Sequence, residues 1–332
     1  MKQSAFESIH EGLWNDFEGQ LVKFEALAMR RSVENEDREQ FIDNFELISK
    51  HLAFAKTRGY SLELVDHLNQ LVTRGHFVLH KSQANPLDNI FEFFVTGFAR
   101  EVRRARYFVL VAAISFLLPA IVIGAMIQYS PHYITSVLSS GQIQQFERMY
   151  SSTEARIGRE RSGASDIAMF GFYVYNNTQI GLRAFASGVL FCLPSILVLG
   201  FNGLFISAII NHLSVIGLGN TIFSFVIGHS AFELTAIVLS GAAGIMLGYA
   251  LIHPGALPRR EAVRRIGASA AKIALGAALM FILAAFIEAF WSSLRFVSPE
   301  IKYLVGACFW VLTFSYFLFA GRNADRETTS RT

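Results

Sequence analysis

Long apolar runs separated by polar segments dominate the sequence after Arg106. The clear runs are 107–128, 184–201, 221–252, 266–290 and 301–320. A helix needs about 20 predominantly apolar residues to cross a bilayer. Inside a bilayer each backbone N–H and C=O must find its partner within the protein, so such runs fold as helices. We therefore predict an all-α protein whose residues 107–320 form a polytopic transmembrane helix bundle.

The composition agrees with a membrane protein that has some soluble part. Hydrophobic residues make up 52% and charged residues 17% of the chain, against roughly 45–50% and 25% in soluble domains. The formal charge of +3 is too small to indicate nucleic acid as a partner. Cys192 and Cys308 lie in apolar runs without paired spacing, which predicts buried free thiols and neither a disulfide nor a zinc site. We predict no cofactor.

Residues 1–106 are predicted to be an amphipathic helical region. Apolar residues recur there at intervals of three and four, which is the period of a helix with one buried face. The stripes are Phe6, Ile9, Leu13, Phe17, Leu21, Phe24 and Leu27; Phe41, Phe45, Ile48, Leu52 and Ala55; and Leu64, Leu68, Leu71 and Leu79. Ser61 stands before the third stripe as an N-cap. Such stripes must bury against one another, so residues 1–85 should form a small bundle.

Basic residues beside the apolar runs predict the orientation. They are Arg100, Arg103, Arg104 and Arg106 before the first run, Arg259, Arg260, Arg264 and Arg265 before 266–290, and Arg322 after the last. We therefore expect both termini, including the tail 321–332, to be cytoplasmic and the segment 129–180 to be external. Cytoplasmic termini require an even number of crossings, whereas five runs are clear. Residues 203–219 are expected to supply the difference, as a short crossing or a re-entrant piece, giving about six segments.

The apolar run 221–252 contains the stretch GHSAFELTA, in which His229 and Glu233 lie four residues apart. Four residues are about one helical turn, so both side chains lie on one face. The same face continues through Ala236, Ser240, Gly244 and Gly248, small residues of the kind that let membrane helices pack closely. The pair should therefore face protein and not lipid. It is either a proton, ion or substrate site or a hydrogen bond that locks the bundle.

Other polar residues of the apolar runs are candidates for the same intramembrane site. Glu288, near the outer end of its run, is the expected third partner of His229 and Glu233. Asn176, Asn177 and Arg183 begin the second run from the same side, whereas Asn202 lies toward the opposite end. His229, Glu233 and Glu288 could also hold a metal, although this ligand set is weaker than an H-E-x-x-H motif.

Several segments together resemble the stage II sporulation protein M family. They are Trp14, LAFAK at 52–56, LNQLVTRGH at 68–76, YNNTQIGLRAFASGVL at 175–190, FNGLFIS at 201–207, GHSAFELTAIVLSGAAG at 228–244 and AAFIEAF at 284–290. One departure is that the family has Pro-His-Gly where this chain has Gly228–Ser230. The resemblance implies a multi-pass protein of the bacterial cytoplasmic (inner) membrane with a cytoplasmic N-terminal helical region.

The resemblance also implies a non-enzymatic envelope scaffold, or a subunit of a membrane complex with membrane or envelope protein partners beside the lipid bilayer. Self-association into a homo-oligomer stays open. The alternative is a transporter or channel for a small solute, ion or lipid that uses the intramembrane His/Glu site. A third interpretation is an intramembrane metalloenzyme.

Overall fold

The computed structural model describes residues 2–27, 35–82, 90–151 and 166–322, and it divides the chain into two compact units, Met1–Phe91 and Glu92–Thr332. The sequence placed this division near residue 106. The difference arises because residues 92–105, although rich in arginine, bury their other face in the second unit. Phe98, Val102 and Ala105 belong to the core of that unit.

The first unit is a three-helix bundle of α1 (Gln3–Leu27), α2 (Asn35–Arg58) and α3 (Leu62–Ser82). Its core is built from the predicted stripes and includes Phe17, Phe41, Ile48 and Leu68, which are almost fully buried. The predicted cap is present, since the backbone N–H of Leu64 donates to Ser61 Oγ at 3.4 Å.

One position of the first stripe was predicted wrongly. Ile9 is 62% exposed and lies outside the core, whereas Trp14, which the predicted stripe did not include, is buried. The Trp14 indole N–H donates to His51 Nδ1 at 3.1 Å, which satisfies its polar group inside the core. A tryptophan buries more area than an isoleucine, and here it is also hydrogen-bonded.

The second unit is a helix bundle, and the described residues of both units contain no strand. It begins with η1 (Phe93–Gly97), α5 (Phe98–Arg104) and α6 (Arg106–Tyr129), followed by η2 (Pro131–Ser136) and α7 (Ser140–Ser151). The remaining elements are α8 (Asp166–Ala186), η3 (Ser187–Val189), α9 (Leu193–Leu213), η4 (Ser214–Leu218), α10 (Gly219–Ile252), α11 (Arg259–Ile287), η5 (Glu288–Ser292) and α12 (Pro299–Phe319).

Four stretches of the described residues are long and apolar enough to cross a membrane: Arg106–Tyr129, Leu193–Ile252, Arg259–Ser292 and Pro299–Phe319. The second is 60 residues long and consists of α9 and α10 joined across η4. Gly217 has φ +91° in this turn, a backbone conformation that favours glycine. Segment 203–219 is therefore no separate element, because 203–213 is the second half of α9 and 214–218 is the turn.

The predicted span 184–201 is wrong, because a turn interrupts it. It contains the end of α8, the turn η3 and the start of α9, with Phe191 and Cys192 both at positive φ. Hydropathy hid this turn, since its residues SGVLFCL are themselves mostly apolar. Helix α8 itself is not among the four stretches of the described residues that are long and apolar enough to cross a membrane.

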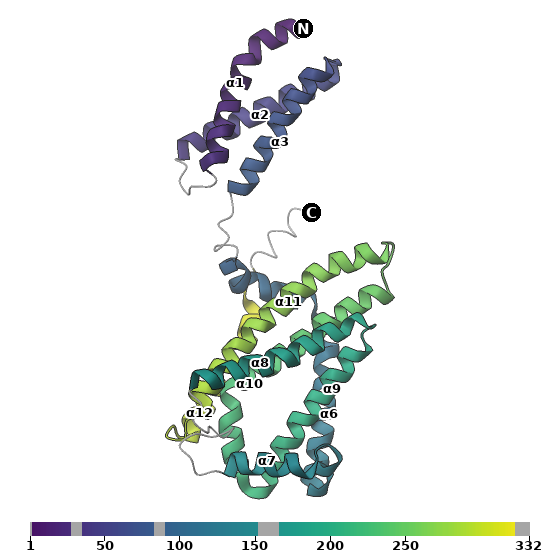
Figure 1. Cartoon of the computed structure of the whole chain (residues 1–332), viewed down its shortest axis with the longest axis vertical. Helices are drawn as coiled ribbons and strands as arrows, with labels where there is room; N and C mark the ends of the chain where they lie inside the picture. The colour runs from purple at the N-terminus through teal and green to yellow at the C-terminus, as the bar shows by residue number, and fades with distance from the viewer. Residues whose placement is uncertain (1, 28–34, 83–89, 152–165, 323–332) are drawn as a thin grey trace. The chain divides into compact units, whose positions relative to one another are not determined.

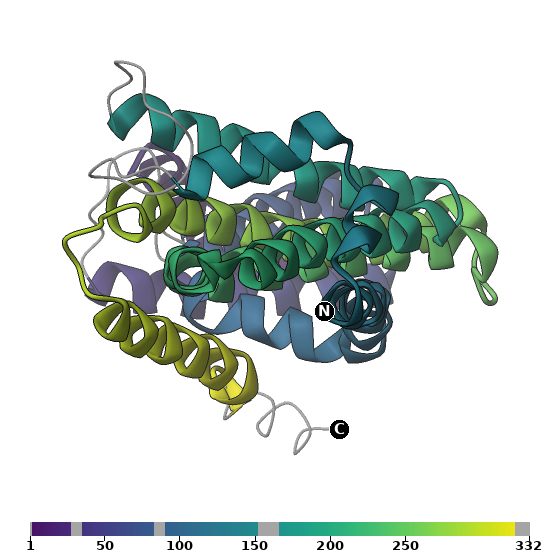
Figure 2. The same cartoon turned by 90° about the horizontal axis from the view of Figure 1, so that it is seen from below.

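Helix α10 lies at the centre of the second unit and packs on α6, α8, α9, α11 and α12. Helices α6 and α9 run alongside each other in Figure 1, and α12 lies at one edge of the bundle in Figure 2. The small-residue face of α10 is buried as predicted: Ala236, Ser240, Gly244 and Gly248 all face protein. A Cβ on Gly188 would meet the backbone of Gly244, and a Cβ on Gly244 would meet Ser195 Oγ and the Ala184 carbonyl, so neither residue has room for a side chain.

The two cysteines are free, as predicted, but they are not both buried. Cys192 is half-buried and Cys308 is exposed on α12. Within the segment 129–180, residues 152–165 lie outside the described residues, as do residues 323–332 of the predicted tail.

Candidate functional site

His229 and Glu233 lie one turn apart on the packing face of α10. Their side chains interact, with His229 Nε2 at 3.6 Å from Glu233 Oε2. Both are enclosed, since only 5% of the His229 side chain and 15% of that of Glu233 is exposed. The neighbouring glycine makes room for the facing helix: a Cβ on Gly228 would meet Ser292 Oγ at 2.9 Å.

Glu288 joins this pair from the end of α11. One ligand atom from each of His229, Glu233 and Glu288 can be chosen so that all three lie within 4.8 Å of one another. Glu288 is the first residue of η5, a single π-helical turn, and Ser292 is the last. Ser292 Oγ is 3.1 Å from His229 Nδ1, so it orients the imidazole from the other side. This π turn ends the helical stretch that begins with α11.

Helix α8 provides the polar wall of the cluster. The Asn177 side chain is 1% exposed and interacts with the Glu288 carboxyl group. Within 3.5 Å, however, neither Asn177 Nδ2 nor Glu288 Oε2 has a hydrogen-bond partner in the described chain. Asn176 Nδ2 donates to Asn177 Oδ1 at 3.1 Å and so fixes the amide. A donor and an acceptor thus interact at the centre of the cluster without a hydrogen bond of 3.5 Å or less, which is unusual for buried polar atoms.

Two tyrosines that the sequence analysis missed also belong to this region. Tyr150 on α7 is buried against α9 and α10, and it interacts electrostatically with Glu288, Tyr173 and Glu233. Burial, together with these neighbours, raises the pKa of the Tyr150 phenol well above its usual range. The hydroxyl therefore stays protonated and neutral beside the carboxylates. Only the aromatic content of α7 and α8 could have suggested these residues, because no spacing rule links them to α10.

Helix α12 anchors the η5 turn with a buried lysine. Lys302 is 1% exposed, and its ammonium group donates to the Ser292 carbonyl at 2.8 Å. Farther along α12, Trp310 Nε1 donates to Ser230 Oγ at 3.2 Å. These bonds tie α12 to both elements that carry the cluster. Lys302 binds Ser292, and Ser292 in turn contacts His229, so the lysine is separated from the cluster by one residue.

Two of the predicted site residues lie elsewhere. Arg183 is exposed and donates to Gln179 Oε1 on its own helix at 3.3 Å. Asn202 donates to the Val198 carbonyl at 2.7 Å, also within its own helix. Because α8 and α9 are separate helices, the residues predicted to share one span point to different surroundings. The structure brings together His229, Glu233, Glu288 and Asn177, with Asn176 as a support.

The cluster is suited to holding a positive charge. Two carboxylates this close in an apolar bundle repel each other when both are ionised, unless a cation compensates them. If the bound cation is a proton, one carboxyl group holds it and no further ligand is needed. A divalent transition metal would take one imidazole nitrogen and two carboxylate oxygens at about 2.0–2.2 Å, donor atoms that zinc accepts. Side chains within 4.8 Å of one another would close by roughly 1 Å to reach that geometry.

The fold and this cluster define a multi-pass helical membrane protein with ionisable groups buried in its bundle. The model of the Stage II sporulation protein M family matches residues 107–293, which is more than half of the chain, and the chain therefore belongs to this family. A domain of unknown function (DUF8413) matches residues 4–81, the three-helix unit. No curated protein and no solved structure matches the chain.

Proposed function

We propose that this membrane protein binds a cation, either a proton or a divalent metal ion, at His229, Glu233 and Glu288, and couples this binding to transport across the membrane. The convergence of the three ionisable side chains from α10 and η5 carries the proposal. Intramembrane ionisable residues are costly to bury, and those that face the interior of a bundle commonly mark ion or proton pathways.

The surroundings of the cluster favour reversible binding. Glu288 Oε2, which has no hydrogen-bond partner in the described chain, can take up an arriving cation without first breaking a protein hydrogen bond. The π turn that carries Glu288 is a local irregularity of α11, and irregular membrane helices often line transport sites.

The experiment uses the full chain in proteoliposomes loaded with pH-sensitive or metal-sensitive dyes. An imposed gradient of protons, Zn²⁺ or Mn²⁺ should dissipate faster than in empty liposomes, and Glu233→Gln should abolish the difference. Glu300→Gln is the matched control, because it makes the same chemical change at an exposed position of α12. Equal flux in wild type and Glu233→Gln, for every one of these cations, would refute the transport proposal.

A second candidate is the role of a subunit that assembles a membrane or envelope complex, and the first unit favours it. Residues Met1–Phe91 form a compact unit with its own core, and this unit matches a separate family model. An independent helical domain attached to a membrane bundle is suited to docking other proteins. Chemical crosslinking and mild purification from native membranes should then recover partners with the full chain and lose them when residues 1–91 are deleted. Recovery of the same proteins by both chains would exclude docking through this unit.

A further inference from the structure

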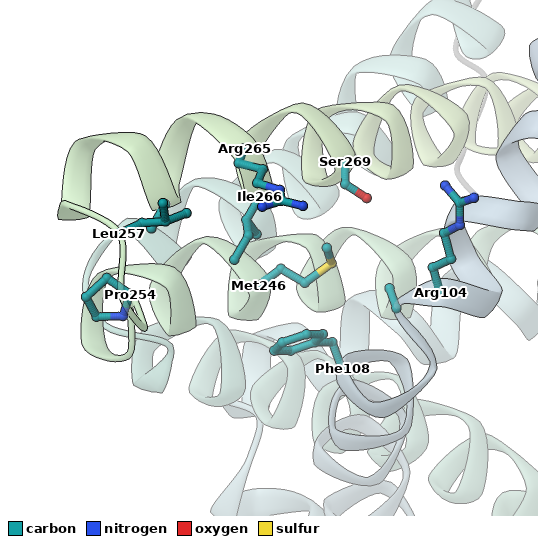
Figure 3. A pocket seen from close by; sticks show the side chains of 10 residues that line it. Arg104, Phe108, Met246, Pro254, Leu257, Arg265, Ile266 and Ser269 are labelled. Carbon is teal, nitrogen blue, oxygen red and sulfur yellow. The ribbon is translucent and has the colours of Figure 1, made fainter. Parts of the chain in front are cut away.

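A cavity of about 400 Å³ lies at the end of the membrane bundle where α10 turns into α11 (Figure 3). Phe108 from α6, Met246 from α10 and Ile266 from α11 provide an apolar lining. The volume is within the range of about 300–1,000 Å³ typical of pockets that enclose small ligands. The cavity is far along α10 from His229, so it is distinct from the candidate site.

Two arginines and a serine make the other part of this cavity polar. Arg104 at the end of α5 and Arg265 on α11 both line it, and Ser269 stands between them in Figure 3. Apolar and cationic surfaces thus lie side by side in one pocket. This combination matches an anionic amphiphile better than a purely polar or purely apolar ligand.

The guanidinium groups of this cavity are available for a ligand. Arg265 makes no ion pair or hydrogen bond with the rest of the described chain, whereas its neighbour Arg264 pairs with Glu261 at 2.9 Å. The carboxylate nearest to Arg104 is Glu101, at 3.8 Å.

The Glu101 carboxylate has other partners. It accepts a hydrogen bond from Ser269 Oγ at 2.5 Å, and it lies 3.4 Å from Lys272 Nζ. Its negative charge is therefore shared among several donors and leaves the cavity with net positive charge.

We propose that this cavity binds an anionic phospholipid, with the phosphate between Arg104 and Arg265 and the first part of an acyl chain against Phe108, Met246 and Ile266. The place of the cavity supports a lipid over a free phosphate compound. It lies where α6 begins and α10 ends, which is the level at which lipid headgroups meet membrane helices. Basic pockets between membrane helices commonly bind such headgroups, and guanidinium groups suit phosphate oxygens.

The test is a thermal-shift titration of the full chain in neutral detergent with dioleoyl phosphatidylglycerol. The comparison ligands are dioleoyl phosphatidylcholine, dioleoylglycerol and inorganic phosphate. We expect saturable stabilisation by phosphatidylglycerol alone. Arg265→Gln should weaken it at least tenfold, which corresponds to about 1.4 kcal/mol. Arg264→Gln is the matched control and should change it less than twofold, because Arg264 is already paired with Glu261.

A second variant keeps both arginines and removes the space instead. Leu257, at the rim of the cavity, is 38% exposed in the loop between α10 and α11, so Leu257→Trp should be tolerated there and fill the cavity. It should abolish the stabilisation by phosphatidylglycerol. The proposal is overturned if Arg264→Gln and Arg265→Gln weaken the binding of phosphatidylglycerol equally, because the lipid would then be attracted by the positive charge of the whole surface and not held in the cavity. It is also overturned by equal stabilisation from phosphatidylcholine or inorganic phosphate, or by unchanged binding in Leu257→Trp.

Discussion

Glu288→Gln tests the electrostatics of the buried cluster, because it removes one charge and leaves the size of the side chain unchanged. The ligand atoms of Glu233 and Glu288 lie no more than 4.8 Å apart. At an effective dielectric constant of about 20, two like charges at that separation repel by at least about 3.5 kcal/mol. In the absence of a bound metal, the folded protein either bears this repulsion or holds a proton on one carboxyl group.

Holding the proton has its own free energy. It costs about 1.4 kcal/mol for each pH unit above the solution pKa of a glutamate, which is about 4.3. This amounts to about 1 kcal/mol at pH 5 and about 3.7 kcal/mol at pH 7. The folded protein adopts the less costly state, so the stabilisation expected from Glu288→Gln grows from about 1 kcal/mol at pH 5 to about 3.5 kcal/mol at pH 7 and then levels off.

The assay is thermal unfolding of the full chain in detergent with a chelator, followed by intrinsic fluorescence from pH 5 to pH 9. For a unit of this size, 1 kcal/mol corresponds to roughly 2–4 °C in Tm. Glu288→Gln should therefore raise Tm by roughly 2–4 °C at pH 5 and by roughly 7–14 °C at pH 7. The wild type should lose stability as pH rises, because its folded state holds a proton that the unfolded state releases.

Glu92→Gln, at an exposed position of the same unit, should leave Tm and its pH dependence unchanged. If Glu288→Gln lowers Tm equally at pH 5 and pH 7 in the presence of the chelator, the two carboxylates do not repel each other and the charge argument for the site fails. Added Zn²⁺ or Mn²⁺ should stabilise the wild type more than Glu288→Gln if the bound cation is a metal.

Two further predictions concern packing and pH. In Gly244→Ala the new Cβ would meet Ser195 Oγ at 2.5 Å and the Ala184 carbonyl oxygen at 2.6 Å, so thermal unfolding should show a loss of stability of about 1–3 kcal/mol. Gly171→Ala on α8 is the control, because its Cβ has open space, and it should gain up to about 1 kcal/mol. Equal Tm values for the two variants would contradict the close approach of α8 and α10. In the first unit, burial and the neighbouring His10 lower the pKa of His51. As pH falls, the unfolded chain therefore takes up a proton near pH 6.5 before the folded chain does. The free energy of unfolding of residues 1–91, measured in urea, should fall between pH 7.5 and pH 5.5, and it should fall less in His51→Gln. Identical pH dependence in the wild type and in His51→Gln would contradict this assignment.

Local patterns predicted much of the fold. The period of the apolar residues identified the three helices of the first unit, because the buried face of a helix repeats every three or four residues. The same rule placed His229, Glu233 and the small residues of α10 on one protected face. Periodicity could not show which of Ile9 and Trp14 enters the core, because that choice depends on the shape and hydrogen-bond partners that α2 offers.

Hydropathy was less informative about where the chain turns. It merged the end of α8 with the start of α9, because a turn made of apolar residues has the same hydropathy as a helix. It also sets α8 apart from the four stretches that could cross a membrane, since Asn176, Asn177 and Arg183 make α8 more polar than its neighbours. In the structure α10 and α11 cover much of α8, so lipid need not solvate its polar face.

The sequence by itself determined the class of protein, the helical content and the polar face of α10, because these follow from composition and from the geometry of a single helix. Only the tertiary structure decided what meets that face. The π turn at Glu288–Ser292 brings a second carboxylate and a serine hydroxyl to His229 and Glu233, and α7 and α8 add Tyr150 and Asn177. Such meetings depend on how helices distant in the chain pack, and the close contact of Gly188 with Gly244 is the kind of packing that sets them.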